Sequence, residues 1–342
     1  MNDGGFRAIH SMMPPPTSIL ITGLHGFVAP HLVAACAQAY PTAALFGLVH
    51  APTLPPGAAL ASHTQSVATH VTEIAGDITD DTQVRRALHA AQPDLIFHLA
   101  ALSSVSASWQ APLDALYVNA GGFVHLAEGI RAEGLAPRVV VVGSGEQYGA
   151  VEQGDAPITE EAPLRPVNPY AVAKATQDLF AFQYFKAYHL DVVRARPFNH
   201  FGPGQGADFV VASFARQIAQ IEAGAVSPIL TVGNLAAQRD FLPVSDVAQA
   251  YVALARHGRA GEAYNVGSGV ARSIASILDM LVKMANVEVQ VQVDMALFRP
   301  TETPRLWADT AKIRRDTGWS PTIPLEEALR VTLLYWREQI HA

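Results

Sequence analysis

From Thr17 onward, short apolar runs alternate with stretches of helical periodicity. Continuous apolar runs are typical of parallel strands that are covered on both faces. We predict such strands at "SILITG" (18–23), "PDLIFHLAA" (93–101) and "PRVVVVGS" (137–144), and helices between them at "DDTQVRRALHAA" (80–91) and "DALYVNAGGFVHLAEGIRAEG" (114–134). This alternation predicts an α/β fold with a doubly wound, Rossmann-like parallel sheet.

The regular alternation ends after "LDVVRARPF" (190–198), and "EAYNVGSG" (262–269) reads as one further strand of the main sheet. We therefore predict a flexible leader over residues 1–16 and a dinucleotide-binding domain over 17–198, to which the chain returns over about 240–268. Residues 199–239 and 269–342 are expected to form a smaller mixed lobe that binds the substrate.

A glycine array follows the first predicted strand and opens the first helix: Gly23, Gly26 and Ala29 in "TGLHGFVA". Glycines at such a turn allow the backbone to approach a pyrophosphate, which then lies at the helix N-terminus. The position between a strand and a helix is the context that gives this otherwise weak motif its meaning. We predict that it binds a nicotinamide dinucleotide.

The end of the second predicted strand bears on the choice of cofactor. A carboxylate there binds the ribose hydroxyls of NAD, and an arginine meets the extra phosphate of NADP. This chain has His50, without either group. NADP(H) is favoured, with NAD(H) possible. Asp77 is placed either to contact the adenine or to cap the following helix.

Composition excludes several classes of function. The formal net charge of −7 argues against a nucleic-acid partner, and no apolar run approaches the roughly 18 residues that would span a membrane. The single cysteine, Cys36, allows no internal disulfide and agrees with a reducing cytoplasm. The histidines form no ligand motif, so we expect no metal.

Tyr170 and Lys174 lie four residues apart in "NPYAVAKATQDLF", a spacing that places both side chains on one face of a helix. Ser144 ends a central predicted strand, at the edge of the sheet where ligands bind. A nearby ammonium is expected to lower the pKa of the phenol, and the serine hydroxyl can hold a carbonyl oxygen. The three residues predict a proton relay for hydride transfer.

The chain resembles the extended short-chain dehydrogenase/reductase family, in its nucleotide-sugar branch. The resemblance rests on "TGLHGFVA", "HLAA", Asn119, "NPYAVAK", "RPFNHFGPGQG", "RDFLPVSDVAQAY" and "TGWSPTIPLEEAL", in that order from about Ser18 to the C-terminal helix. It implies catalytic roles for Ser144, Tyr170, Lys174 and Glu146. It also implies that the cofactor contacts Gly23, His25, Gly26, Phe27, Val28, His50, Asp77, Ile78, Leu99, Ala100, Ala101, Tyr170, Lys174 and Pro197.

Within that branch "RPFNHFGPGQG", "VGNLAAQRDF" and "FRPTETP" are most similar to enzymes that act on GDP-sugars. The resemblance implies reduction of the C4 ketone of GDP-4-keto-6-deoxy-D-mannose to GDP-D-rhamnose, with Tyr170 as proton donor. It implies substrate contacts from Ser103, Ser108, Asn199, Val210, Arg239, Arg299 and Glu302. Alternatively, Arg299 and Glu302 form surface ion pairs, and the two serines are ordinary loop residues.

Two other functions compete with this one. A GDP-mannose 4,6-dehydratase shares nearly all of these features and needs one more acid/base, for which Glu146 is placed. Against it, such enzymes usually carry threonine where this chain has Ser144. A sensor that binds ligand without turnover is disfavoured by the intact Ser144, Tyr170 and Lys174.

Relatives usually pair through two helices per subunit. The corresponding segments are the helix around 119–131 and the helix carrying Tyr170, whose "LFAFQYF" (179–185) is more apolar than a solvated face. We therefore predict a homodimer joined by a four-helix bundle.

Overall fold

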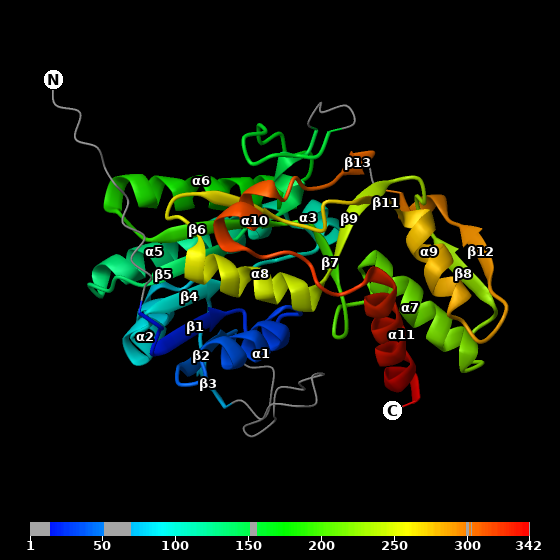
Figure 1. The fold of residues 1–342 in the computed structure, drawn as a ribbon, viewed down its shortest axis with the longest axis horizontal. Coiled ribbons are helices and arrows are strands. Elements are labelled where there is room, and N and C mark those ends of the chain that lie inside the picture. Colours follow the sequence, from blue (N-terminus) through cyan, green and yellow to red (C-terminus); the bar gives the residue numbers. More distant parts are fainter. Residues whose placement is uncertain (1–13, 51–69, 151–155, 299–300, 302, 342) are drawn as a thin grey trace.

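The structure, a computed structural model, describes residues 14–50, 70–150, 156–298, 301 and 303–341. Its largest element is a seven-stranded sheet in the order β10-β6-β5-β4-β1-β2-β3, with every neighbouring pair parallel (Figure 1). The strands are β1 (Ser18–Thr22), β2 (Ala44–Val49), β3 (Val71–Ala75), β4 (Leu95–His98), β5 (Arg138–Val142), β6 (Val192–Pro197) and β10 (Ala263–Val266). The predicted doubly wound α/β fold is confirmed.

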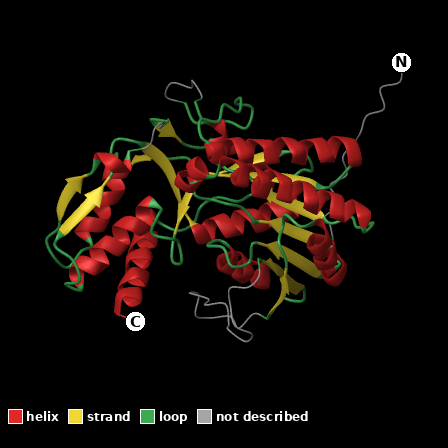
Figure 2. Cartoon of the chain, turned by 180° about the vertical axis from the view of Figure 1, so that it is seen from behind, coloured by secondary structure: helices red, strands yellow, loops and turns green. Residues whose placement is uncertain are grey.

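Helices cover both faces of this sheet, as the view from behind also shows (Figure 2). One face carries α1 (Ala29–Ala39), α8 (Val244–His257) and α10 (Ala311–Thr317), and the other carries α2 (Asp81–Ala91), α5 (Gly122–Ala132) and α6 (Pro169–Tyr188). Because strand side chains alternate between faces, Ile19 and Ile21 join the first core while Leu20 joins the second. Both faces of the sheet are buried under helices, which explains the continuous apolar runs in the strands.

The helix predicted over 114–134 is divided in the structure. It begins as α4 (Pro112–Leu116), widens into a π-helical turn, η1 (Tyr117–Gly121), and continues as α5. Asn119 lies buried in the wide turn, where its amide accepts a hydrogen bond from Leu102 N and donates one to Leu102 O. A π turn inserts one extra residue into a helix, and such turns are frequent at functional sites.

The rest of the chain builds a second group of elements. β7 (Asn199–Phe201), β9 (Gln238–Pro243), β11 (Ala271–Ser273) and β13 (Arg305–Leu306) form one small sheet, and β8 (Ile229–Val232) pairs with β12 (Gln290–Val293). Around a separate apolar core pack α7 (Val210–Glu222), α9 (Ile274–Lys283) and α11 (Leu325–His341). Three short helices complete the described elements: α3 (Val105–Gln110), η2 (Gly145–Tyr148) and η3 (Met295–Leu297).

Most of the predicted leader, residues 1–13, lies outside the described residues. Among the helices that are described, none is long and apolar enough to cross a bilayer.

Candidate active site

A pocket of about 240 Å³ opens at the carboxyl edge of the large sheet. It lies where the strand order reverses, since the chain passes from β1 to β2 on one side and later returns to β4 on the other. Ligands bind at such reversal points in doubly wound sheets. The lining includes Gly23 after β1, Leu99 after β4, Ser144 after β5 and Pro197 at the end of β6.

The glycine turn between β1 and α1 forms one wall. Gly23 has φ +73°, and a Cβ added there would lie 2.9 Å from Ala100 N and Cα. Only glycine therefore lets these two loops approach so closely. The N-terminus of α1 follows, with Pro30 in its first turn and no side chain capping it. The N-terminus of a helix favours an anion such as a pyrophosphate.

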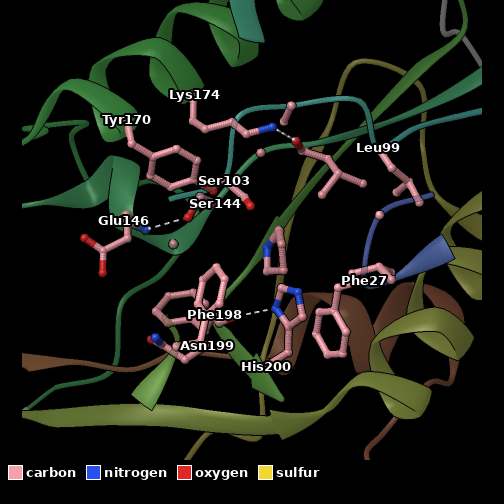
Figure 3. A pocket seen from close by; sticks show the side chains of 18 of the residues that line it. Phe27, Leu99, Ser103, Ser144, Glu146, Tyr170, Lys174, Phe198, Asn199 and His200 are labelled. Carbon is pink, nitrogen blue, oxygen red and sulfur yellow. Dashed lines mark hydrogen bonds between the residues drawn. The ribbon is translucent and has the colours of Figure 1, made fainter. Parts of the chain in front are cut away.

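Ser144 is fixed by the short helix that follows it. Its Oγ accepts a hydrogen bond from Glu146 N over 3.2 Å (Figure 3). Its own N–H donates to Gln147 Oε1 over 3.3 Å. The Gln147 amide in turn donates to the buried carboxylate of Asp178. The serine hydroxyl is thereby oriented at the strand end, beside Tyr170.

Tyr170 enters from the first turn of α6. Asn168 caps this helix by accepting a hydrogen bond from Ala171 N over 2.8 Å, and Pro169 fits the first helical position because its missing N–H would have no partner. Burial raises the pKa of Tyr170 to about 12; the neighbouring Ser144 hydroxyl opposes this rise and the Glu146 carboxylate adds to it. The expectation that an ammonium lowers this pKa is wrong, because Lys174 does not contribute to the shift.

The reason is the direction of Lys174. Its Nζ donates to Val142 O over 2.7 Å (Figure 3) and also to Gln177 Oε1 over 3.0 Å. Burial lowers the pKa of Lys174 to about 7. Both side chains line the same pocket, yet the ammonium is held on a carbonyl and an amide oxygen of the protein.

Two further polar groups face the same space. Glu146 accepts a hydrogen bond from Asn168 Nδ2 over 3.3 Å, so the residue that caps α6 also holds the carboxylate. Asn199 lines the pocket from β7 (Figure 3). The pocket therefore brings a phenol, a hydroxyl, a carboxylate and an amide together.

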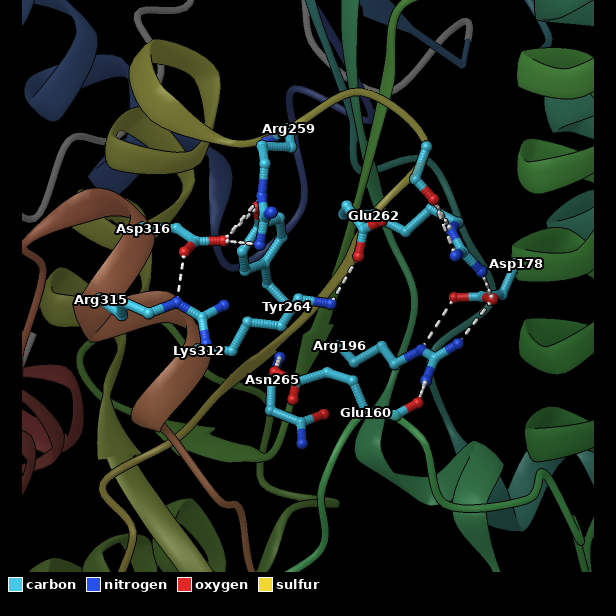
Figure 4. A network of polar contacts seen from close by, with 12 residues as sticks. Glu160, Asp178, Arg196, Arg259, Glu262, Tyr264, Asn265, Lys312, Arg315 and Asp316 are labelled. Atoms are coloured by element: carbon cyan, nitrogen blue, oxygen red, sulfur yellow. Dashed lines mark hydrogen bonds and ion pairs between the residues drawn. The ribbon is translucent and has the colours of Figure 1, made fainter. Parts of the chain in front are cut away.

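Helix α6 also takes part in a buried ionic network (Figure 4). Asp178 is one turn beyond Lys174 on α6 and accepts hydrogen bonds from Arg194 Nη1 over 2.5 Å and from Arg196 Nε and Nη2 over 3.0 and 2.8 Å. The arginines hold the pKa of this carboxyl below its usual range against the opposing effect of burial, which is the largest single influence. The network ties α6 to β6 and, through Gln147, to the end of β5.

Thirteen of the predicted residues line the pocket: Gly23, Gly26, Phe27, Val28, Leu99, Ala101, Ser103, Ser144, Glu146, Tyr170, Lys174, Pro197 and Asn199. Eight described ones lie outside its lining: His25, His50, Asp77, Ile78, Ala100, Ser108, Val210 and Arg239. Arg299 and Glu302 lie outside the described residues.

Ser108 differs most from its expected place. It is buried, its hydroxyl donates to Val105 O over 2.7 Å, and it accepts a hydrogen bond from Tyr170 N over 3.1 Å. In this structure it anchors the start of α6 and does not line the pocket. Asp77 is not the helix cap either, because Asp80 caps α2; Asp77 accepts hydrogen bonds from Thr79 and lies 3.4 Å from His50 Nδ1.

Several lining residues were not predicted, among them Phe198, His200, Gln205, Phe209, Tyr251 and Leu306. His200 and Gln205 belong to the quoted "RPFNHFGPGQG", so their position after a strand end was a usable signal. Tyr251 lies inside α8 among core residues, where the sequence pattern only indicates burial.

The comparisons with known proteins agree with this geometry. The sequence profile of the family described as GDP-mannose 4,6 dehydratase matches residues 20–332. The chain belongs to this family. It is 34% identical to a Pseudomonas aeruginosa protein named GDP-6-deoxy-D-mannose reductase, over 94% of this chain and 98% of that one.

Solved structures give the same placement of the chain. A structure titled "Structure of RMD from Pseudomonas aeruginosa complexed with NADPH" matches with a TM-score of 0.80 and 33% identity, covering 94% of this chain and 100% of that one. A dTDP-glucose 4,6-dehydratase from Streptomyces venezuelae, solved with NAD and DAU, also matches with a TM-score of 0.80 at 27% identity, covering 94% and 98% of the two chains. Membership of the nucleotide-sugar branch, predicted from the motifs, is thereby confirmed.

Proposed function

We propose that this member of the GDP-mannose 4,6 dehydratase family reduces the C4 ketone of GDP-4-keto-6-deoxy-D-mannose to GDP-D-rhamnose with NADPH or NADH. The observation that carries the proposal is the convergence of Ser144, Tyr170 and Lys174 in one pocket with the glycine turn. The similarity to a protein named GDP-6-deoxy-D-mannose reductase supplies the substrate.

A nicotinamide dinucleotide fits the residues present. The turn at Gly23 packs closely against the backbone of Leu99 and Ala100, lines the pocket and precedes the N-terminus of α1. When bound, the cofactor supplies the hydride that reduces the ketone carbon. The related structure solved with NADPH and the absence of an acid at His50 both favour NADP(H) over NAD(H).

Tyr170 is the proton donor in this reaction. Since burial keeps its pKa at about 12, the phenol is fully protonated near neutral pH and can give its proton to the oxygen formed at C4. Ser144 is held by Glu146 N and Gln147, so its hydroxyl can bind that oxygen without reorganising. Lys174 lines the same pocket and, as the resemblance implies, would hold the nicotinamide ribose.

The GDP part of the substrate is assigned by residue type and by resemblance. Asn199 opens on the pocket, and Arg239 is buried on the adjoining strand β9, where its Nη1 donates to Gln238 O. A guanidinium suits a diphosphate because its planar fork can bind two oxygens. The proposed substrate contacts also include Ser103, Val210, Arg299 and Glu302. Because most of these contacts lie in residues 199–239 and 269–342, we propose that this part of the chain binds the nucleotide sugar.

The test is to incubate the purified protein with GDP-4-keto-6-deoxy-D-mannose and NADPH or NADH, following cofactor absorbance and product by chromatography. Loss of reduced cofactor and formation of a GDP-6-deoxyhexose are expected. The Tyr170→Phe variant, which lacks the proton donor, is the control and should show little of either. Cofactor binding without any turnover would contradict the proposal and support a sensor.

One observation favours a second activity. Glu146 lines the pocket and is oriented by Asn168, as the additional base of a 4,6-dehydratase would have to be. Conversion of GDP-mannose to its 4-keto-6-deoxy form, without net cofactor consumption and abolished by Glu146→Gln, would establish that activity in place of the reductase.

We propose in addition that the protein is a homodimer. Exposed apolar side chains gather on α6 (Val172, Leu179, Phe180, Phe182) and on the adjacent α4 and η1 (Leu113, Leu116, Tyr117). The segment expected to pair alongside α6, 119–131, covers the end of η1 and most of α5. Since α5 buries its apolar residues in the core that it shares with α2 and the sheet, we assign the bundle to α6, α4 and η1. Such a patch favours association with a second copy.

A further inference from the structure

The fully buried side chain of Gln177 contacts the amine of Lys174 and lies three residues after it on α6. Its Oε1 accepts a hydrogen bond from Lys174 Nζ over 3.0 Å, and within the described residues this is the side chain's only hydrogen bond. Gln147, by contrast, links the backbone of Ser144 to Asp178. The amide of Gln177 therefore serves the lysine and does not join α6 to another described element by a hydrogen bond.

The nitrogen end of the same amide is unpaired. Gln177 Nε2 is buried and has no hydrogen-bond partner in the part of the chain that the structure describes. Turning the amide over would direct this donor at the ammonium, which also has only donors, so Lys174 fixes which end faces it. Burying an unpaired donor costs free energy, and methionine, of similar size, would bury none. The acceptor, and not the packing, explains a glutamine at this position.

The Lys174 amine is thus held by two acceptors. Val142 O, at the end of β5, lies 2.7 Å from Nζ (Figure 3), and Gln177 Oε1 is the second. A protonated amine has three N–H groups, so one remains for the pocket that Lys174 lines. A neutral amine has two N–H groups and would leave its lone pair there instead.

The two acceptors differ in origin, since Val142 O belongs to the backbone and Gln177 Oε1 depends on the side chain. We propose that Gln177 is a positioning residue: it takes a second N–H of Lys174, so that one position of the amine is left for a hydroxyl of the bound ligand. An amide does this without a charge, whereas a carboxylate would hold the amine in its charged form. The inference rests on the proposed function in taking Lys174 as part of the active site.

Other titratable groups surround the amine. Burial lowers the pKa of His98, at the end of β4, to about 3, and the Lys174 charge adds to this effect. Burial raises the pKa of Tyr170 to about 12, so both rings are neutral near pH 7. Glu146 faces the same pocket from η2, and Asp178, the next acid along α6, is paired with two arginines. All of them are kept in the variants below, so differences in the titration of Lys174 report on the amide.

The experiment follows the lysine amine directly by NMR. The chain has four lysines, Lys174, Lys186, Lys283 and Lys312, so a protein labelled with [13C]lysine gives few signals. The Cε signal of Lys174 is assigned by its loss in Lys174→Arg and is then followed against pH, without substrate or cofactor. Because burial lowers the pKa of Lys174 to about 7, the wild-type midpoint is expected near pH 7.

Gln177→Met keeps the size of the side chain and removes the acceptor. A hydrogen bond to the charged form favours that form, so the Lys174 midpoint should fall by about one pH unit. Gln177→Glu keeps an acceptor and adds a charge, and it should raise the midpoint by about one to three pH units. Gln183→Met, the same change at an exposed position of α6, is the matched control and should leave the midpoint where it is in the wild type.

The same variants are then assayed with GDP-4-keto-6-deoxy-D-mannose and NADPH. Gln177→Met should lower kcat by about tenfold with little change in KM for the sugar, because the amine is no longer held in place. Gln177→Glu, which retains an acceptor, should recover most of this loss. Gln183→Met should have the kcat of the wild type.

Equal Lys174 midpoints in the wild type and Gln177→Met, an equal shift in Gln183→Met, or a kcat that Gln177→Met leaves unchanged would overturn the inference. The outcome is separable from the proposed function. Shifted midpoints in a protein that reduces no ketone would reject the reductase alone, and ketone reduction with equal midpoints would reject the positioning role alone.

Discussion

The ammonium nitrogen of Lys174 lies 2.7 Å from the carbonyl oxygen of Val142, the last residue of β5. The second residue after Val142 is Ser144, so the cation is attached to the strand that also presents the serine. Its position is set by the sheet as much as by its own helix. Folding therefore changes the surroundings of the Lys174 amine, and with them its pKa.

The first prediction concerns pH. The pKa of Lys174 falls from 10.5 in an unfolded chain to about 7 in the folded protein. Between these values the unfolded state binds more protons, so this residue makes the protein more stable as pH rises from about 7, and its destabilising effect is fully present below that. Lys174→Met should therefore lose part of the rise in melting temperature between about pH 7 and pH 9.5, a difference equivalent to about 3 kcal/mol. Parallel plots of melting temperature against pH for the wild type and Lys174→Met would contradict this.

The second prediction concerns Tyr170. Removing its hydroxyl in Tyr170→Phe should reduce kcat for the ketone by about a hundredfold or more, because general acid catalysis contributes that much. The dissociation constant for NADPH, measured by fluorescence, should change little. A variant that reduces the ketone at the wild-type rate would exclude Tyr170 as the proton donor.

The third prediction concerns the buried carboxylate. Asp178→Ala leaves Arg194 and Arg196 without their shared partner and should lower the free energy of unfolding by about 3–5 kcal/mol. Asp191→Ala is the matched control, since Asp191 pairs with Arg138 but is 30% exposed and should cost at most about 1 kcal/mol. Equal losses in urea unfolding would show that burial of the network has no energetic role.

The fourth prediction concerns the start of α6. Asn168→Ala removes the cap on Ala171 N and should lower the free energy of unfolding by about 1 kcal/mol, whereas Asn168→Ser should recover most of it. Thermal unfolding of both variants measures this. Identical melting temperatures for the alanine and serine variants would mean that the cap contributes nothing.

The fifth prediction concerns association. Leu179 is 60% exposed on α6, and Leu179→Glu should convert the proposed dimer to a monomer in gel filtration with light scattering. Val293→Glu alters a side chain of similar exposure, 53%, on β12 and should leave the dimer intact. A wild type that elutes as a monomer would reject the dimer itself.

The large sheet was predictable because its strands are apolar on both faces, and the Tyr170 and Lys174 pair because helical spacing fixes a common face. The contacts of those side chains were not predictable, because Lys174 could equally have reached the phenol of Tyr170. The roles of Ser108 and Asn119 depend on loops brought together across the fold. Tyr251 gave no signal because a ligand-facing phenol and a core tyrosine occupy the same positions in a helical pattern.

Helix α6 carries Tyr170, Lys174 and Asp178 at four-residue intervals on its inner face and the exposed Val172, Leu179 and Phe180 on its outer side. The two faces are about 10 Å apart, the diameter of one helix. A second subunit that binds the outer side of α6 would therefore help to hold Tyr170, the proton donor, in position. Specific activity should then fall when the enzyme is diluted below the dissociation constant of the proposed dimer.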